Sequence, residues 1–274
     1  MKTGIVIQTR MSSTRLPGKV LKPLPCGSRM TVLDQVMRRA QSARRAEAVV
    51  IATTTGREDD PVVQAARKAG AFVFRGSRDD VLSRYALAAE EFGLGTVVRV
   101  TSDCPCIDPR LIDAVIAKHL REGNDYTFNR GFAGGLDEEV VSLEALRTAH
   151  LEAKRDFERE HVTVFMQESH PERFKIGVLD ARGALRMAGT KISVDTQEDY
   201  ALSCAVYDFL YPQNRLFGAR AIARLFARRP WLRWINARSY QKQALFTKAQ
   251  EFREAKKLLS LYGFPRVVRA LRSR

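Results

Sequence analysis

Long apolar runs are absent from this sequence of 274 residues. No stretch approaches the roughly 20 consecutive apolar residues that a membrane-spanning helix needs. The N-terminus also lacks the pattern of a signal peptide, because a single lysine precedes the short apolar run 4–7, which is typical of a buried strand. We therefore expect a soluble protein of the cytoplasm.

Cysteine is scarce, and its spacing argues against two kinds of site. Four cysteines do not make a disulfide framework in a chain of this length. Cys104 and Cys106 are too close for the usual spacing of zinc ligands, and no second pair accompanies them. We expect free thiols. Internal repeats, zinc-finger and RNA-recognition signatures and the GxxxxGK[ST] phosphate loop are absent as well.

Charge is abundant and very unevenly distributed. The net charge is +15, and residues 213–274 contain 16 Lys/Arg against two acids, whereas residues 1–212 contain 30 basic and 29 acidic residues. The composition changes abruptly at Tyr211-Pro212. We therefore predict one domain over 1–212 and a basic, mostly helical extension over 213–274, with helices at 219–227 and 244–262.

Short apolar runs rich in Val, Ile and Phe alternate with helical patterns, in which apolar residues recur every three or four positions. Such alternation is typical of an α/β fold with a parallel sheet and helices on both faces. The predicted strands or extended segments are 5–7, 48–52, 71–74, 96–100, 125–129, 174–178 and 191–194. The predicted helices of the domain are 31–42, 60–69, 79–92, 109–122 and 197–210.

The loop after the first predicted strand concentrates groups that bind phosphate. Arginine and lysine neutralise phosphate oxygens, and small residues let backbone N–H groups approach them. Ligands of open α/β sheets bind at this edge of the sheet. The loop therefore predicts a triphosphate site, and a basic surface loop without a ligand is the alternative. The residues concerned are Arg10, Ser12, Ser13, Arg15, Gly18 and Lys19.

Two aspartates that follow predicted strands are candidate metal ligands. Asp103 follows the strand 96–100, and Asp195 follows the segment 191–194. Carboxylates suit Mg²⁺, which also keeps waters and bridges to substrate phosphates. Each aspartate also fits the start of a helix, where acids cap free backbone N–H groups. Both interpretations stay open from the residues alone, and capping is the stronger one for Asp195.

Taken together, these segments resemble the cytidylyltransferase family of spore-coat polysaccharide biosynthesis type, which is related to the CMP-KDO and CMP-sialic acid synthetases. The order and spacing of the motifs agree over about residues 1–210. The matching segments are QTRMSSTRLPGKVLKPL (8–24), VVIATTTGREDDPVV (49–63), VFRGSRDDVLSRY (73–85), RVTSDCPCIDP (99–109), GLDEEVVSLEAL (135–146), REHVT (159–163) and SVDTQEDY (193–200).

The resemblance implies a Rossmann-like, GT-A-like nucleotidyltransferase fold with three layers. It also implies a Mg²⁺-dependent transfer of CMP from CTP to a sugar, expected to be acidic, with release of pyrophosphate in surface polysaccharide or glycan biosynthesis. A homodimer is expected. By position, the triphosphate-binding residues are Arg10, Arg15 and Lys19, and the metal ligands are Asp103 and Asp195. Arg75, Ser77 and Asp80 lie in a nucleoside or sugar segment, and Asp137, Glu139 and His161 lie in acceptor segments.

The chain departs from the family pattern in two places. The family commonly has an Arg-Trp pair where this chain has Lys191-Ile192-Ser193, and an aliphatic residue where it has Cys106. Neither change removes a proposed phosphate or metal ligand, but the first leaves acceptor specificity open. A glycosyltransferase that uses a nucleotide sugar is the alternative enzyme, although such a donor site does not need a cationic loop for a free triphosphate.

The basic extension lies outside the resemblance, and three interpretations stay open. Its helices pack on the body or on a second subunit, with the arginines solvated. Alternatively, they dock peripherally on the anionic inner membrane surface, because Lys/Arg-rich amphipathic helices with aromatics such as Trp231 and Trp234 can lie there. The third interpretation is a nucleic acid or another acidic partner, although no specific nucleic-acid motif is present.

Overall fold

The computed structural model describes residues 2–239 and 248–271. The chain divides into two compact units, Met1–Ser239 and Tyr240–Arg274. The compositional change at Tyr211-Pro212 therefore does not coincide with the division between the units, and the assignment of 1–212 and 213–274 as domains stays a prediction. None of the described helices is long and apolar enough to cross a membrane.

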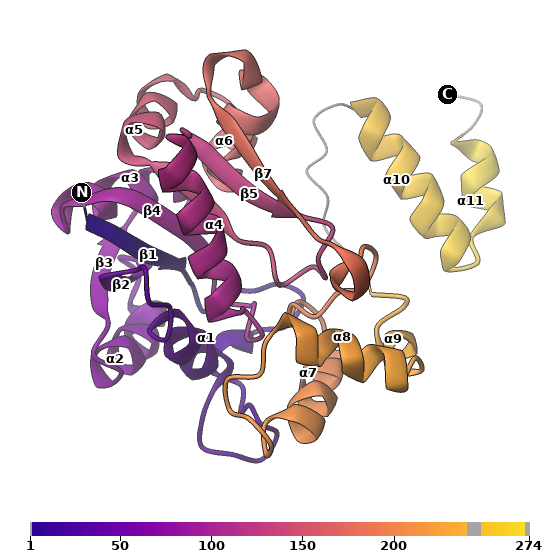
Figure 1. Ribbon diagram of the computed structural model, residues 1–274. Helices are drawn as coiled ribbons and strands as arrows, with labels where there is room; N and C mark the ends of the chain where they lie inside the picture. The colour runs from indigo at the N-terminus through magenta and orange to yellow at the C-terminus, as the bar shows by residue number, and fades with distance from the viewer. Residues whose placement is uncertain (1, 240–247, 272–274) are drawn as a thin grey trace. The chain divides into compact units, whose positions relative to one another are not determined.

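A seven-stranded mixed sheet forms the centre of the first unit (Figure 1). Its strands are β1 (Lys2–Gln8), β2 (Ala48–Thr54), β3 (Phe72–Gly76), β4 (Leu94–Thr101), β5 (Tyr126–Arg130), β6 (Glu139–Ser142) and β7 (Ile176–Asp180). They lie in the order β3-β2-β1-β4-β6-β5-β7. β1 pairs in parallel with β2 and β4, as predicted, because right-handed crossovers through helices join these strands.

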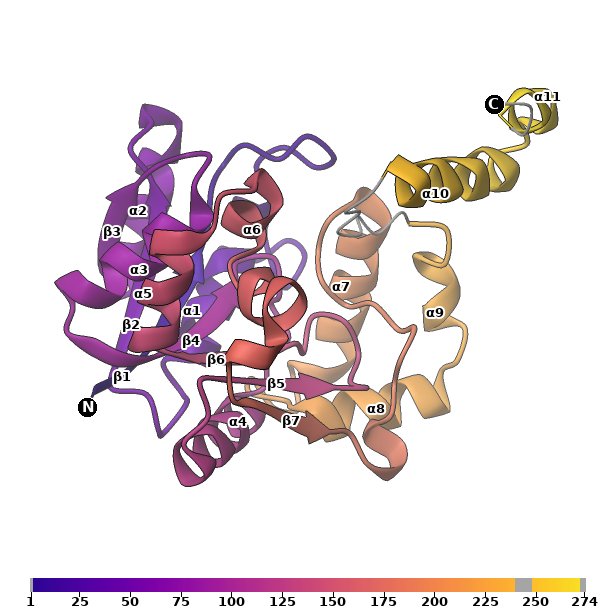
Figure 2. The same ribbon diagram turned by 90° about the horizontal axis from the view of Figure 1, so that it is seen from above.

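Helices cover both faces of the sheet, which makes the unit a three-layer, Rossmann-like sandwich (Figures 1 and 2). The helices are α1 (Val32–Ala40), α2 (Asp60–Lys68), α3 (Val81–Glu91), α4 (Pro109–Glu122), α5 (Leu143–Glu152), α6 (Asp156–His161), α7 (Gln197–Leu210), α8 (Ala219–Arg228) and α9 (Leu232–Ile235). Alternate residues of β1 face opposite ways: Ile5 and Ile7 join the core beneath α1, α4 and α7, whereas Val6 joins the core beneath α3 and α5.

The parallel sheet predicted from the strand–helix alternation is confirmed for β1 to β4. The sheet as a whole is mixed, because the short strand β6 runs antiparallel to both β4 and β5. One predicted strand is wrong: segment 191–194 is not a strand of the sheet, and Lys191 forms only an isolated bridge with Gly134. The backbone N–H groups of this segment form hydrogen bonds to two other loops. Ile192 N donates to Gly134 O (2.8 Å), and Val194 N donates to Asp103 O (2.7 Å).

The helices α8 and α9 belong to the first unit although their sequence is strongly basic. The inner face of α8 contributes Ile222, Leu225 and Phe226 to the core, and its arginines lie on the exposed face. A buried guanidinium of α1 helps to hold this region. Arg39 donates to Phe217 O (2.7 Å) and Ile107 O (3.1 Å).

The second unit contains α10 (Lys248–Leu261) and α11 (Pro265–Ala270), which pack against each other. Helix α10 agrees with the helix predicted over 244–262, of which residues 244–247 lie outside the described residues. The helix predicted over 219–227 is confirmed as α8.

Candidate active site

The candidate active site lies at the carboxyl ends of β1 and β4, where parallel strands of an α/β sheet present their loops. The first loop follows β1 and contains Arg15 and Lys19. The second follows β4 and begins with Ser102 and Asp103. The hydrogen bond between Val194 N and Asp103 O brings the loop that precedes α7 to the same place.

Local structure sets the path of the first loop. Leu16 is buried in the core and anchors the middle of the loop. Gly18 has φ +65°, a left-handed conformation that glycine adopts without strain, and it turns the chain so that Lys19 begins a short 3₁₀-helix, Lys19–Leu21. At the start of the loop, Met11 N donates to the buried carboxylate of Asp59 (2.6 Å). The sequence therefore places the Lys19 side chain over the end of the sheet.

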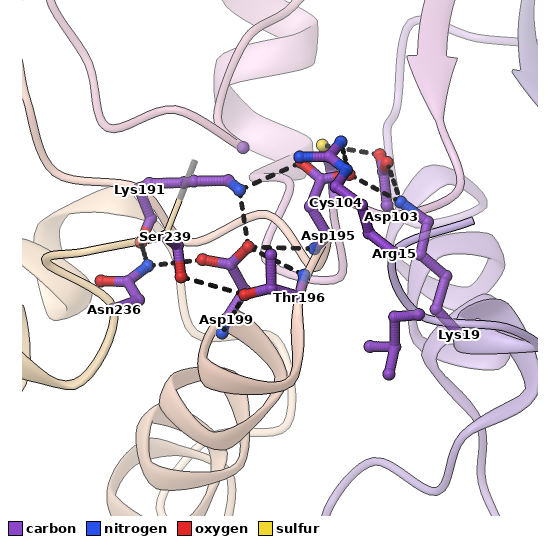
Figure 3. Close-up of polar contacts among 12 residues, drawn as sticks. Arg15, Lys19, Asp103, Cys104, Lys191, Asp195, Thr196, Asp199, Asn236 and Ser239 are labelled. Atoms are coloured by element: carbon purple, nitrogen blue, oxygen red, sulfur yellow. Dashed lines mark hydrogen bonds and ion pairs between the residues drawn. The ribbon is translucent and has the colours of Figure 1, made fainter. Parts of the chain in front are cut away.

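Lys19 joins the two predicted metal ligands (Figure 3). Its Nζ lies 2.7 Å from Asp103 Oδ2 and 2.9 Å from Asp195 Oδ1. Burial acts to lower the pKa of Lys19, but the charges of the two carboxylates outweigh it and raise the pKa. The ammonium group is therefore charged. It brings together Asp103 and Asp195, which lie 84 and 176 positions after Lys19 in the chain.

Asp195 is surrounded by three cations. Besides Lys19, Arg15 Nη2 lies 3.0 Å from Oδ1 and Lys191 Nζ lies 3.0 Å from Oδ2. Burial acts to raise the pKa of Asp195, but Lys19 and then Lys191 lower it to about 2. Asp195 is therefore a carboxylate throughout the physiological range.

Neither candidate metal ligand caps a helix, so the capping alternative is wrong for both. The N-cap of helix α4 is Asp108, whose side chain accepts from Arg110 N. The N-cap of helix α7 is Thr196, which forms a capping box with Asp199. Because other residues cap these helices, the carboxylates of Asp103 and Asp195 are directed to the Lys19 ammonium instead.

Sequence reasoning missed the residues that position Asp195 in addition to Arg15 and Lys19. Lys191 Nζ lies 2.6 Å from Oδ2 of Asp199, a fully buried carboxylate. Asn236 Nδ2 donates to Asp199 Oδ1 (2.8 Å) and to Lys191 O (3.0 Å). Thr196 and Ser239 join the same network through their hydroxyls at 2.9 Å (Figure 3). No local pattern signals this network, because Lys191 lies in an irregular loop and Asn236 is 37 positions from Asp199.

The donor set fits a divalent cation that substrate helps to bind. Among the described residues, no group of three or more His, Cys, Asp and Glu side chains is arranged to hold a metal. Asp103 and Asp195 nevertheless share one cation, the ammonium of Lys19. Mg²⁺ is commonly held by one or two carboxylates, waters and substrate phosphates, so two carboxylates are sufficient.

Of the other residues predicted to bind nucleotide, Arg10 and Ser13 lie in the loop after β1, whereas Arg75 lies in β3 and contacts the loop after β2. Arg10 is exposed, and Ser13 Oγ accepts from Leu16 N (3.4 Å). The guanidinium of Arg75 donates hydrogen bonds to Thr54 O (2.8 Å), Gly56 O (2.6 Å) and the Asp60 carboxylate (2.7 Å). These bonds shape the loop after β2.

The Ser77–Asp80 segment shapes the start of α3. Ser77 Oγ accepts from Asp80 N (3.2 Å), and Asp80 accepts from Ser83 N (2.9 Å) as the cap of the helix. Asp80 also pairs with Arg159 of α6 (2.8 Å). The contacts of both residues are therefore structural in the protein without ligand.

The predicted acceptor residues lie in and next to β6 and at the end of α6. Glu139 pairs with Arg99 and accepts from Thr163 Oγ1 (2.7 Å), and although burial acts to raise its pKa, Arg99 lowers it. Asp137 accepts from Gly135 N (2.8 Å), and burial raises its pKa. His161 is half-buried at the end of α6, next to Val162, which has φ +59°.

Comparison with known proteins shows the family to which the chain belongs. Residues 4–225 match the family described as Cytidylyltransferase. The chain is 34% identical to the spore coat polysaccharide biosynthesis protein SpsF of Bacillus subtilis over 204 residues, which cover 74% of this chain and 85% of that protein.

Two solved structures share the fold. A cytidylyltransferase from Leptospira borgpetersenii superposes with a TM-score of 0.78 at 30% identity, covering 90% of this chain and 100% of that one. A CMP:2-keto-3-deoxy-manno-octonic acid synthetase complexed with CTP superposes with a TM-score of 0.60 at 14% identity, covering 76% and 99% of the two chains. With the family match over most of its length, the chain belongs to the cytidylyltransferase family and is a nucleotidyltransferase.

Proposed function

We propose that the protein transfers CMP from CTP to a sugar acceptor and releases pyrophosphate. The observation that carries this proposal is the meeting of Lys19 with Asp103 and Asp195 beside Arg15. A loop with three cations suits a triphosphate, and the two carboxylates suit the cation that accompanies it.

The reaction is a displacement at the α-phosphorus of CTP. An acceptor oxygen forms the new P–O bond, the bond from the α-phosphorus to the bridging oxygen breaks, and pyrophosphate carries away the negative charge. Arg10, Arg15 and Lys19 stabilise that charge, and backbone N–H groups near Ser12, Ser13 and Gly18 contact the phosphate oxygens. Positioning and charge neutralisation are sufficient for such a step.

Asp103 and Asp195 are the groups that would hold Mg²⁺, and a bound Mg²⁺ supplies polarisation of the α-phosphate. Lys191 keeps Asp195 ionised and in place. Lys19 bridges the two carboxylates, and its ammonium group would pass to a phosphate oxygen when substrate binds.

The acceptor is proposed to be an acidic sugar used in surface polysaccharide or glycan biosynthesis. Asp137, Glu139 and His161 are proposed to line its site, and Arg75, Ser77 and Asp80 to border the nucleoside or sugar. A cytoplasmic location, a homodimer and a peripheral place at the inner membrane surface remain proposals.

Thermal unfolding with CTP, UTP, ATP and GTP, each with Mg²⁺ and then with EDTA, tests the proposal. A ligand at about 100 times its dissociation constant stabilises the folded state by about 2.7 kcal/mol, which raises Tm by several degrees. We expect a Mg²⁺-dependent shift selective for CTP. No shift with any triphosphate, together with a shift on adding nucleotide sugars, would favour the glycosyltransferase alternative and overturn the proposal.

A further inference from the structure

The second unit exposes an apolar tip between its two helices. Helix α10 ends at Leu261, and Gly263 follows with a φ of +81°, so that Phe264 N donates back to Leu259 O (2.8 Å) before α11 begins. The large apolar residues at and beside this turn are unusually exposed. The exposed fractions are 57% for Leu261, 59% for Tyr262, 53% for Phe264 and 45% for Val267.

The helices of this unit do not bury a core of their own. Among residues 248–271, Val268 is the one buried side chain. Two short helices gain little stability from hydrogen bonds alone, because most helical stability in proteins comes from packing an apolar face. An apolar surface of this kind is typical of a segment that binds something else.

The same segment is strongly cationic. Residues 240–274 contain nine Lys/Arg and two Glu. Arg253, Arg266 and Arg269 are exposed, and no ion pair links them to the rest of the described chain. An apolar tip bordered by cations complements a surface with an anionic layer above an apolar interior.

We propose that this hairpin, residues 248–271, docks on an anionic lipid bilayer. The tip of Leu261, Phe264 and Val267 enters the boundary between headgroups and acyl chains, and the arginines contact the lipid phosphates. A nucleic acid offers anionic phosphates without an apolar layer, so it leaves the tip exposed. The proposal does not depend on the enzymatic reaction.

Co-sedimentation of the full-length protein with vesicles tests the proposal. We expect binding to vesicles rich in phosphatidylglycerol, weak binding to pure phosphatidylcholine, and a decrease as salt is added. The charge variant Arg253→Gln, Arg266→Gln and Arg269→Gln should lower partitioning by about 10²-fold, since each cation near an anionic surface contributes about 1 kcal/mol, which is a factor of about five.

A matched control removes three exposed arginines from α8. Arg220→Gln, Arg224→Gln and Arg228→Gln lower the net charge equally, and this variant should keep most of the binding. A second variant, Phe264→Ser with Val267→Ser, leaves the charges intact and should lower partitioning by about tenfold or more through lost apolar burial. Leu151→Ser, which changes a side chain of the first unit that is 81% exposed, is its control.

Three results would overturn the proposal. The first is absence of binding by the unaltered protein, and the second is an equal loss in the α8 control. The third is a tip variant whose oligomeric state in sedimentation velocity differs from that of the unaltered protein, while neither protein binds vesicles. A second copy of the chain would then cover the tip. The CTP-dependent thermal shift of each variant is measured alongside, so that failure of this proposal is distinguished from failure of the catalytic one.

Discussion

Two regions of the molecule meet at Asp195, and they differ in how deeply their cations are buried. On one side, Arg15 and Lys19 come from the loop after β1, and their side chains are 34% and 12% exposed. On the other side, Lys191 is 7% exposed and is paired with Asp199, which is fully buried. Both regions place ammonium groups about 3 Å from the same carboxylate.

The difference in burial indicates a difference in role. A partly exposed cation at the mouth of a site is available to phosphate, and it costs little stability when it moves. A buried ion pair resists movement, because breaking it leaves a charge without a partner in a poorly solvated place. We therefore assign the loop after β1 to the substrate and the Lys191–Asp199 pair to holding Asp195. The predictions below separate these two roles.

The largest expected effect is on stability and belongs to the buried region. Lys191→Met leaves Asp199 buried beside Asp195 without its cation, so the free energy of unfolding should fall by about 3 kcal/mol. Urea unfolding measures this change. Lys118→Met, which removes a lysine paired with Glu122 on the surface, should cost about 0.5 kcal/mol or less. Equal losses in the two variants would contradict the assigned role.

The next effect is on turnover and belongs to the loop after β1. Lys19→Ala should lower kcat by about 10²-fold or more, the effect of losing one preorganised charge stabiliser. Lys22→Ala, three residues further along, is the matched control. Pyrophosphate release measures turnover. Unchanged turnover in the Lys19 variant would remove Lys19 from the mechanism.

The third effect is a dependence of stability on acid. The pKa of Asp195 is lowered from 3.8 to about 2 in the folded protein, so the folded state binds this proton less readily than the unfolded state. The resulting stabilisation, about 2 kcal/mol, is complete above about pH 4 and is lost as the pH falls to about 2. The difference in unfolding free energy between the protein and Asp195→Asn, measured across this range, should shrink accordingly. A constant difference contradicts the prediction.

The smallest expected effect is on stability and concerns Asn236, which donates hydrogen bonds to both members of the buried Lys191–Asp199 pair. Asn236→Ala removes the hydrogen bonds to Asp199 and to the carbonyl of Lys191, and we expect a loss of about 1 to 2 kcal/mol in unfolding free energy. Asn214→Ala, at an exposed turn, serves as the control. A fall in kcat for Asn236→Ala without any loss of stability would show that this segment acts on the reaction directly.

The elements found from sequence are those with strong local signals. Helix α4, over 109–122, agrees to the residue because Asp108, Pro109 and Gly123 mark its ends. Strands β1 to β4 were found because each is a compact apolar run bounded by turns. Strand β6 was missed, because the four residues Glu139–Ser142 carry too short a pattern, and its antiparallel pairing is with β4 and β5.

The amino-acid sequence by itself determined the α/β alternation, the cationic loop and the uneven charge, because each depends on residue type and short spacing. Only the tertiary structure decided that Asp103 and Asp195 share Lys19, that Lys191, Asp199 and Asn236 hold Asp195, and that α8 and α9 join the first unit. The physical reason is that most of these contacts join residues far apart in the chain, which the packing of the sheet edges and loops brings together. Lys191 and Asp195 are only four positions apart, but they lie in an irregular loop whose path the sequence pattern does not indicate.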